Sequence, residues 1–312
     1  MSADKTAMKR EESWAIEAAE RVRQRIELNT RGWEPHKKGL LATIQTSYRP
    51  SPLPPGFEVL QLEAAGVRRR AAISRAPGRP VLLLPGLYAS LDEGLFIRTA
   101  LLIHRKLKRP VILLEDRFAK ETLRLNGECI PTLRELGEEA AFVASQALRL
   151  VGQEVQASWG DEDDGGDVGS PDVLAFSAGA ASALAAPGAS FARAVLWSAA
   201  INPRDVLLAV KARPLVNAYF RLLHERTFKM AGIRPVPSRR RLVERLCSDQ
   251  PLPPEKLPLL AVHAKDDPVA PSQSLRILGN QDHQATCILF AGGHLGFAAV
   301  AGDEIYLVPL LK

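Results

Sequence analysis

The stretch "VLAFSAGAASALAA" at residues 173–186 changes from an apolar run to a run of small residues within one turn. The apolar run is typical of a β-strand that is buried on both faces, and the small residues favour a helix packed closely against it. Ser177 occupies the turn between the two segments. A strand that leads directly into a helix indicates an α/β protein, in which the two kinds of element alternate.

The rest of the chain repeats this alternation of apolar runs and helical patterns. Two shorter segments, 57–64 and 68–75, are typical of an antiparallel pair of strands. The alternation predicts an open, mostly parallel central sheet flanked by helices, with ligands bound at the carboxyl ends of the strands. The predicted buried strands cover 79–86, 109–116, 171–177, 192–199, 257–264 and 285–292, and the predicted helices cover about 91–107, 132–153, 178–186 and 271–280.

The chain of 312 residues is long enough for one large domain or two small ones. Apolar residues at helical spacing predict an amphipathic helix over 10–28, and a proline-rich segment follows at 48–58. We therefore expect an N-terminal helical extension and linker over residues 1–54, and one main domain over 55–312. Residues 203–256 lie between two predicted strands, and we expect them to form a helical cap inserted into that domain.

The net charge of +6 is concentrated in the predicted cap. Residues 203–256 contain 12 Lys and Arg but 5 Asp and Glu, so the rest of the chain is nearly balanced. A nucleic-acid-binding protein more often spreads a basic face with aromatic side chains, and aromatic residues are only 6% here, so we expect no nucleic-acid partner. The cap charge favours contact with anionic substrates or an anionic membrane surface, and a solvated helix face is the alternative.

Location is predicted from what the sequence lacks. No apolar run reaches the roughly 18–20 residues of a membrane span, and the segment "MSADKTAMKREESW" has no apolar signal-peptide centre. The three cysteines, Cys129, Cys247 and Cys287, are far apart, which favours reduced thiols over disulfides or a metal site. We expect a cytoplasmic protein, with attachment to a membrane surface as an addition to that location.

Ser177 lies in the sequence Ala-Phe-Ser-Ala-Gly, which matches the G-x-S-x-G turn with alanine at its first position. The turn strains the serine backbone, and the residues two before and two after it must be small so that helix and strand can approach. Ala175 and Gly179 meet this requirement. The hydroxyl then projects at the end of the sheet beside a helix N-terminus, which favours negative charge. Ser177 is therefore a candidate nucleophile, with an ordinary small turn residue as the alternative.

An acid and a histidine follow at the ends of later strands. Asp266 and Asp267 both end the segment "LPLLAVHAKDD", and either carboxylate suits the role of orienting an imidazole. His294 follows the last predicted strand, in "FAGGHLGFAA" at 290–299, where an isolated polar residue at a strand end is the alternative. The order serine, aspartate, histidine is the chain order of the α/β-hydrolases.

A tetrahedral intermediate at Ser177 needs hydrogen-bond donors for its oxyanion. The sequence offers two backbone N–H groups for this purpose. One is that of Ala178, directly after the serine, and the other is that of Leu87, in the segment "PGLYAS" that follows a predicted strand.

The remaining histidines have no such partners in the sequence. His104 and His224 fall within helical patterns and are expected at the surface. His263 lies within the predicted strand before Asp266 and is expected to be packed in the interior.

With these motifs the chain resembles the α/β-hydrolase superfamily, and within it the YheT-like esterase branch. The oxyanion loop of that branch, HGLxGS, corresponds to residues 85–90, where Gly86 keeps the family glycine and Pro85 replaces its histidine. The resemblance covers roughly residues 55–300, and it favours Asp267, directly before a proline, as the acid. The other correspondences are Arg117 after the fourth strand, Asp266-Asp267-Pro268, and the GGHxGF pattern at 292–297.

The resemblance implies an α/β-hydrolase fold with a helical cap and a carboxylic ester hydrolase that uses no cofactor or metal. Ser177, Asp267 and His294 would form a catalytic triad that acts through an acyl-enzyme on a small acyl or lipid-like ester. Two alternatives stay open. One is acyl transfer or thioester cleavage by the same residues. The other is a non-catalytic binding protein on a hydrolase scaffold, for which Pro85 and Ala175 are the motivation.

Overall fold

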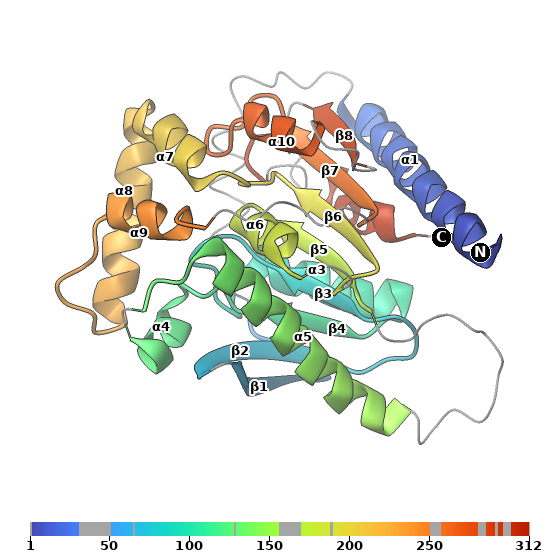
Figure 1. Ribbon diagram of the computed structural model, residues 1–312, viewed down its shortest axis with the longest axis horizontal. Coiled ribbons are helices and arrows are strands. Elements are labelled where there is room, and N and C mark those ends of the chain that lie inside the picture. Colours follow the sequence, from blue (N-terminus) through green and yellow to red (C-terminus); the bar gives the residue numbers. More distant parts are fainter. Residues whose placement is uncertain are drawn as a thin grey trace.

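Within the described residues of the computed structural model, eight strands form one sheet with the order β1-β2-β4-β3-β5-β6-β7-β8 (Figure 1). The pairs β1/β2 and β2/β4 are antiparallel, and the other neighbours are parallel. The strands are β1 (Phe57–Ala64), β2 (Val67–Ser74), β3 (Val81–Leu84), β4 (Val111–Leu114), β5 (Asp172–Phe176), β6 (Arg193–Trp197), β7 (Leu259–Ala264) and β8 (Ala285–Phe290). The structure describes residues 2–30, 51–64, 66–127, 129–155, 170–187, 190–249, 257–279, 285–290, 293–295 and 301–311.

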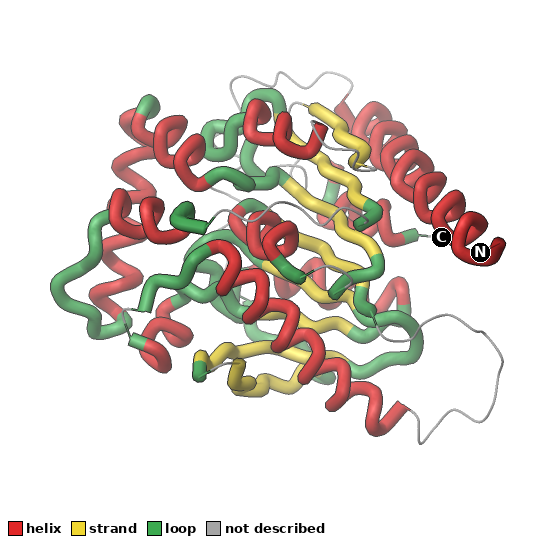
Figure 2. Tube along the Cα trace, in the orientation of Figure 1, coloured by secondary structure: helices red, strands yellow, loops and turns green. Residues whose placement is uncertain are grey.

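Helices cover both faces of this sheet (Figure 2). One apolar cluster joins α1, α3 and η2 to one face, and a second joins α5, α6 and α10 to the other. The helices are α1 (Ser2–Thr30), α3 (Gly94–Leu107), α4 (Lys120–Asn126), α5 (Leu133–Val155), α6 (Ala178–Ala185), α7 (Pro203–Lys211), α8 (Pro214–Met230), α9 (Arg239–Leu246) and α10 (Arg276–Gly279), with 3-10 helices η1 (Ser272–Leu275) and η2 (Asp303–Leu310).

Burial on both faces explains the continuous apolar runs of the central strands. Along β3, Val81 and Leu83 belong to the cluster on one face, whereas Leu82 and Leu84 belong to the cluster on the other. Successive side chains of a strand point to opposite faces, so a strand covered on both sides must be apolar at every position. The predicted mostly parallel sheet is therefore confirmed.

Some local elements of the structure differ from the sequence prediction. The helix α4 was not predicted, because its seven residues are too few to show a periodic pattern. The helix predicted over 271–280 instead begins as the 3-10 helix η1 before α10. There the Ser274 hydroxyl donates a hydrogen bond to the Pro271 carbonyl over 2.8 Å, which is a local alternative to the helical ladder.

The helix α1 packs against the carboxyl-terminal η2. Its apolar stripe, which includes Trp14, Val22 and Ile26, is part of the core on that face of the sheet. The Trp14 indole N–H also donates a hydrogen bond to the Pro309 carbonyl over 3.2 Å. The amphipathic helix predicted over 10–28 is thus part of α1.

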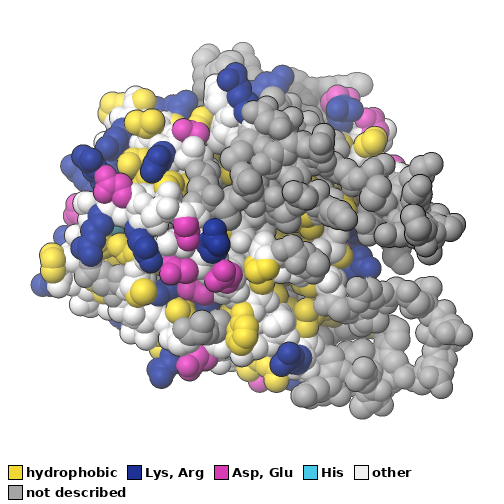
Figure 3. Space-filling model, in the orientation of Figure 1, with side chains coloured by type: hydrophobic (Ala, Val, Ile, Leu, Met, Phe, Trp, Pro, Cys, Tyr) yellow, Lys and Arg dark blue, Asp and Glu magenta, His cyan; other side chains and the backbone are white. Residues whose placement is uncertain are grey.

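The helices α7, α8 and α9 follow β6 and precede β7, and we call them the cap. Phe228, Leu242 and Leu246 of the cap pack against Phe118 and Leu123 of the main sheet domain. On the face drawn in Figure 3, Lys and Arg side chains gather over the cap with hydrophobic side chains among them. Among the described helices, none has the length and apolar character needed to cross a membrane.

Candidate active site

Ser177 lies at a sharp turn between β5 and α6. Its backbone has φ of 49° and ψ of −117°, a conformation that is strained for a residue with a side chain. The Ser177 N–H donates a hydrogen bond to the Trp197 carbonyl over 2.9 Å, which fixes the turn to the end of β6. The strained turn predicted for "AFSAG" is therefore present.

Gly179 allows the close approach of α6 to the neighbouring strand. A Cβ atom at this position would lie 2.5 Å from both the Leu84 and the Pro85 carbonyl oxygens. Backbone atoms cannot yield as a flexible side chain can, so any larger residue would separate α6 from β3. Ala175, at the other small position, is fully buried within β5.

The side chains of Ser177, His294 and Asp267 form one continuous hydrogen-bonded chain. His294 Nε2 lies 2.8 Å from Ser177 Oγ, and His294 Nδ1 lies 2.8 Å from Asp267 Oδ2. Because a carboxylate only accepts, Nδ1 carries the proton and donates to Asp267, which leaves Nε2 to accept from the serine hydroxyl. The structure thus brings together the serine, the acid and the histidine that the sequence analysis singled out.

Asp267 is held by its own turn. Its Oδ1 accepts hydrogen bonds from the N–H groups of Val269 and Ala270, over 2.7 and 2.8 Å. The ring of His263, which is fully buried as expected, lies against the same turn and donates from Nε2 to the Ala270 carbonyl over 2.8 Å. Burial lowers the pKa of His263, which favours its neutral form.

Asp266 contacts the loop that carries His294. Its Oδ1 accepts a hydrogen bond from the Gly293 N–H over 3.1 Å, and Gly293 has a φ of 63°, which favours glycine. On the other side of the histidine, the Leu295 carbonyl accepts a hydrogen bond from the Tyr306 hydroxyl over 2.8 Å. The two adjacent aspartates therefore have different contacts: Asp267 orients the ring and Asp266 holds the backbone.

The loop after β3 lies directly over Ser177. A Cβ atom at Gly86 would lie 3.3 Å from the Ser177 Cβ, so a side chain there would crowd the serine. Leu87 follows this glycine, and Ala178 begins α6 next to the serine. Among the described residues, neither the Leu87 nor the Ala178 N–H has a hydrogen-bond acceptor, so both groups are available to a ligand.

Tyr88 fixes this loop at two points. Its N–H donates to Asp116 Oδ2 over 2.8 Å, and its hydroxyl lies 2.6 Å from His224 Nδ1. His224 Nε2 lies 2.7 Å from the Pro237 carbonyl, which only accepts, so Nε2 carries the proton and Nδ1 accepts from Tyr88. The loop is therefore bonded to the end of β4 and to the cap helix α8.

His224 corrects a sequence expectation, because it is buried with 3% of its surface exposed and was predicted to lie at the surface. The helical pattern did not reveal that this side of α8 packs onto the loop at Tyr88. His104, expected at the surface too, is half-buried and packs edge-to-face on Phe57. Burial lowers the pKa of His224 and raises the pKa of the Tyr88 phenol. Burial also raises the pKa of Asp116 to about 6, against the lowering effect of the Tyr88 N–H.

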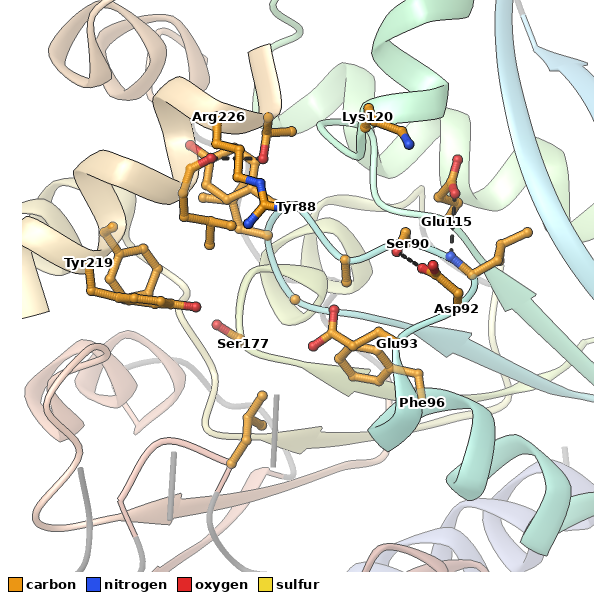
Figure 4. Close-up of a pocket in the computed structure, with 18 of the residues that line it drawn as sticks. Tyr88, Ser90, Asp92, Glu93, Phe96, Glu115, Lys120, Ser177, Tyr219 and Arg226 are labelled. Atoms are coloured by element: carbon orange, nitrogen blue, oxygen red, sulfur yellow. Dashed lines mark hydrogen bonds between the residues drawn. The ribbon is translucent and has the colours of Figure 1, made fainter. Parts of the chain in front are cut away.

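A cavity of about 990 Å³ opens in front of Ser177 and His294. Its walls come from the loop after β3, the start of α3, α4 and the cap helix α8, as the close-up in Figure 4 shows. Apolar side chains such as Leu87, Phe96 and Phe220 form much of the lining. A cavity of this size and character fits a small organic ligand. Among the described residues, no cluster of three or more His, Cys, Asp or Glu side chains has the geometry of a metal site.

Comparisons with known proteins show the fold. No family model matches the sequence, and no curated protein matches it. The esterase Pf2001 of Pyrococcus furiosus aligns with a TM-score of 0.53 and 13% identity, over 80% of this chain and 88% of that one. A mutant of the meta-cleavage product hydrolase CumD gives 0.51 and 19%, over 80% and 96%, and AbyA5 gives 0.53 and 18%, over 80% and 68%.

The chain therefore has the α/β-hydrolase fold, as the sequence predicted. The serine turn between β5 and α6 is a feature of this fold. The mostly parallel sheet and the helices α7 to α9 after β6 are compatible with it. The finer resemblance to the YheT-like branch is not tested by these comparisons and stays a prediction.

Several residues that shape the site were missed by the sequence analysis. Asp116 could have been found, because it is a carboxylate at the carboxyl end of a buried strand, where ligands bind in parallel sheets. Tyr88 and His224 gave no such signal, since their contact joins segments 136 residues apart. Arg117, which is part of the family resemblance, is buried, and its Nε atom lies 3.7 Å from Glu139 Oε2. It is not among the described residues that line the cavity.

Proposed function

We propose that this chain is a serine hydrolase that cleaves carboxylic esters of small acyl or lipid-like substrates. The observation that carries the proposal is the hydrogen-bonded chain from Ser177 through His294 to Asp267, in which Ser177 and His294 line a cavity with many apolar side chains. A serine turn or a buried histidine alone has many explanations. An aligned nucleophile, base and orienting acid is the arrangement that acyl transfer requires.

In the proposed reaction, Ser177 Oγ attacks the ester carbonyl carbon while His294 Nε2 takes the hydroxyl proton. The Asp267 carboxylate stabilises the imidazolium that forms. The carbonyl oxygen becomes an oxyanion and accepts hydrogen bonds from the Leu87 and Ala178 N–H groups. His294 then returns the proton to the departing alkoxide, which leaves an acyl-enzyme on Ser177.

The second half of the reaction repeats these steps with water. His294 takes a proton from a water molecule, whose oxygen attacks the acyl carbon, and the Ser177 oxygen leaves with that proton. The apolar walls of the cavity favour a substrate with an aliphatic or aromatic acyl group, because burying such a group removes apolar surface from water.

Labelling with a fluorophosphonate probe tests the proposal, since the probe bonds covalently to an activated serine. We expect the wild type to be labelled and to hydrolyse p-nitrophenyl esters, and Ser177→Ala to do neither. Asp267→Asn should remain folded and lose about 10⁴-fold in kcat, because an amide that donates to Nδ1 holds the His294 ring in the wrong tautomer. A folded wild type that is neither labelled nor active would instead favour a binding protein on this scaffold.

A further inference from the structure

The charged groups that line the cavity are paired, with two exceptions. Glu115 lies 3.1 Å from the Arg70 guanidinium and accepts from Thr122. Glu121 pairs with Lys120 over 2.8 Å, and the Asp92 carboxylate accepts from the Ser90 hydroxyl. Among the described residues, the side chains of Glu93 and Arg226 have no hydrogen-bond or ion-pair partner.

Glu93 directs its carboxyl group into the cavity. The residue precedes the first turn of α3, yet its side chain makes no capping hydrogen bond to that helix. In Figure 4 its carboxyl group points into the cavity on the side where the Ser177 hydroxyl lies. Glu93 is half-buried, so an unpaired acidic group lies in a partly buried position in the cavity that Ser177 also lines.

An unpaired carboxyl group in such a place is unfavourable for the free protein. Burial, and to a smaller extent the nearby carboxylates of Asp92 and Asp116, together raise the pKa of Glu93 to about 8. A carboxylic acid that ionises reluctantly gains most from a ligand that brings a positive charge to it, because that charge favours the ionised form.

We propose that Glu93 selects substrates whose acyl or alcohol part carries an ammonium group, and that it binds this group next to Ser177. This inference rests on the proposed ester hydrolysis and names a substrate class for it. Phe96 and Tyr219 line the same cavity, and the faces of aromatic rings attract cations.

Among the described residues, Arg226 is the second unpaired charged group of the cavity, and its charge is opposite to that of ionised Glu93. It projects from α8 beside Tyr88, on a different wall from Glu93 (Figure 4). Its guanidinium repels an ammonium group, so a cationic substrate is favoured only in the orientation that places its charge at the Glu93 end. Because Arg226 is exposed to solvent, its charge is screened, and its effect on the orientation of a substrate is smaller than that of the half-buried Glu93.

The test compares matched pairs of esters that differ in charge alone. With the charge in the alcohol, butyrylcholine is paired with 3,3-dimethylbutyl butyrate. With the charge in the acyl group, p-nitrophenyl 4-(trimethylammonio)butanoate is paired with p-nitrophenyl 5,5-dimethylhexanoate. The readout is the ratio of kcat/KM for the cationic and neutral esters, in which the protonation of His294 cancels because it affects both equally.

In at least one pair we expect the wild type to prefer the cationic ester by about tenfold or more at pH 9, which is a modest value for the Coulomb attraction of two opposite charges at a partly buried site. The ratio should rise between pH 7 and pH 9 as Glu93 ionises. In Glu93→Gln the ratio should fall close to one and lose its pH dependence. Glu121→Gln is the matched control, since it removes a paired carboxylate from the same cavity, and it should keep the preference.

Other outcomes separate this inference from the proposed function. Ser177-dependent hydrolysis of the neutral esters with ratios near one, or a preference that survives Glu93→Gln, would overturn the role of Glu93 and leave the hydrolase standing. If no ester is hydrolysed, the proposed function fails. Binding of tetramethylammonium then tests separately whether Glu93 recognises a cation. A rise in Tm with tetramethylammonium that is absent in Glu93→Gln supports cation recognition, and equal shifts in both proteins refute it.

Discussion

The hydrogen bond between Tyr88 and His224 links the cap to the loop that carries Leu87, and Tyr88→Phe removes it with little change in shape. His224 is 3% exposed, so the variant leaves a buried Nδ1 acceptor without a donor. A buried group left unsatisfied costs about 1–3 kcal/mol in the free energy of unfolding. Urea titration should therefore show a loss of stability of that size with an unchanged m-value.

In the proposed reaction the Leu87 N–H is an oxyanion donor, and an effect of Tyr88→Phe on activity is expected because Leu87 directly precedes Tyr88. Complete loss of one oxyanion donor lowers kcat by about 10²–10³-fold. In Tyr88→Phe the backbone N–H of residue 88 still donates to Asp116, so the loop stays attached at one point. The Leu87 N–H is therefore displaced but not lost. We expect kcat to fall by about tenfold, below that limit, with KM little changed, because the donor acts on the transition state.

A double-mutant cycle with His224→Gln separates the pair from its surroundings. The two changes should be coupled by about 0.5–3 kcal/mol in stability and should be non-additive in kcat, because both break the same contact. A variant Tyr88→Phe that loses stability but keeps the wild-type kcat would refute the reasoning, since the bond would then only hold the cap in place.

Three further predictions concern the pH dependence of stability, the packing of α6 and the surface of the cap. Burial lowers the pKa of His224, so as the pH falls below about 6.5 this histidine binds a proton more readily in the unfolded chain than in the folded one. The free energy of unfolding from urea titration should therefore fall below that pH, and it should fall less in His224→Gln. Gly179→Ala places a Cβ 2.5 Å from the Leu84 carbonyl and should lower stability by more than about 3 kcal/mol in urea titration, whereas an unchanged midpoint would contradict the close approach. The basic cap exposes Leu215 and Leu222, which are 76% and 63% accessible. We therefore expect the protein to co-sediment with anionic vesicles, and we expect this binding to weaken with added salt and in Leu215→Glu. Equal binding to neutral vesicles would show that charge has no role.

The sequence by itself determined the class of fold and pointed to the principal residues of the candidate site. Short apolar runs that end in turn residues favour central strands buried on both faces, and the small residues around Ser177 favour one kind of turn geometry. Because parallel strands end at one edge of a sheet, Ser177, Asp267 and His294 could be assigned to one place from their positions after β5, β7 and β8.

Only the tertiary structure decided how that site is held and what its cavity presents. The contact of Tyr88 with His224 joins the loop after β3 to an inserted helix, and helical periodicity says which residues share a face but not what that face meets. The same limit applies to Glu93, because a carboxylate before a helix is normally a cap or a solvated residue. Its place in the cavity depends on the packing of α3, α8 and the loop around it, which arises from contacts distant in sequence and not from any local pattern.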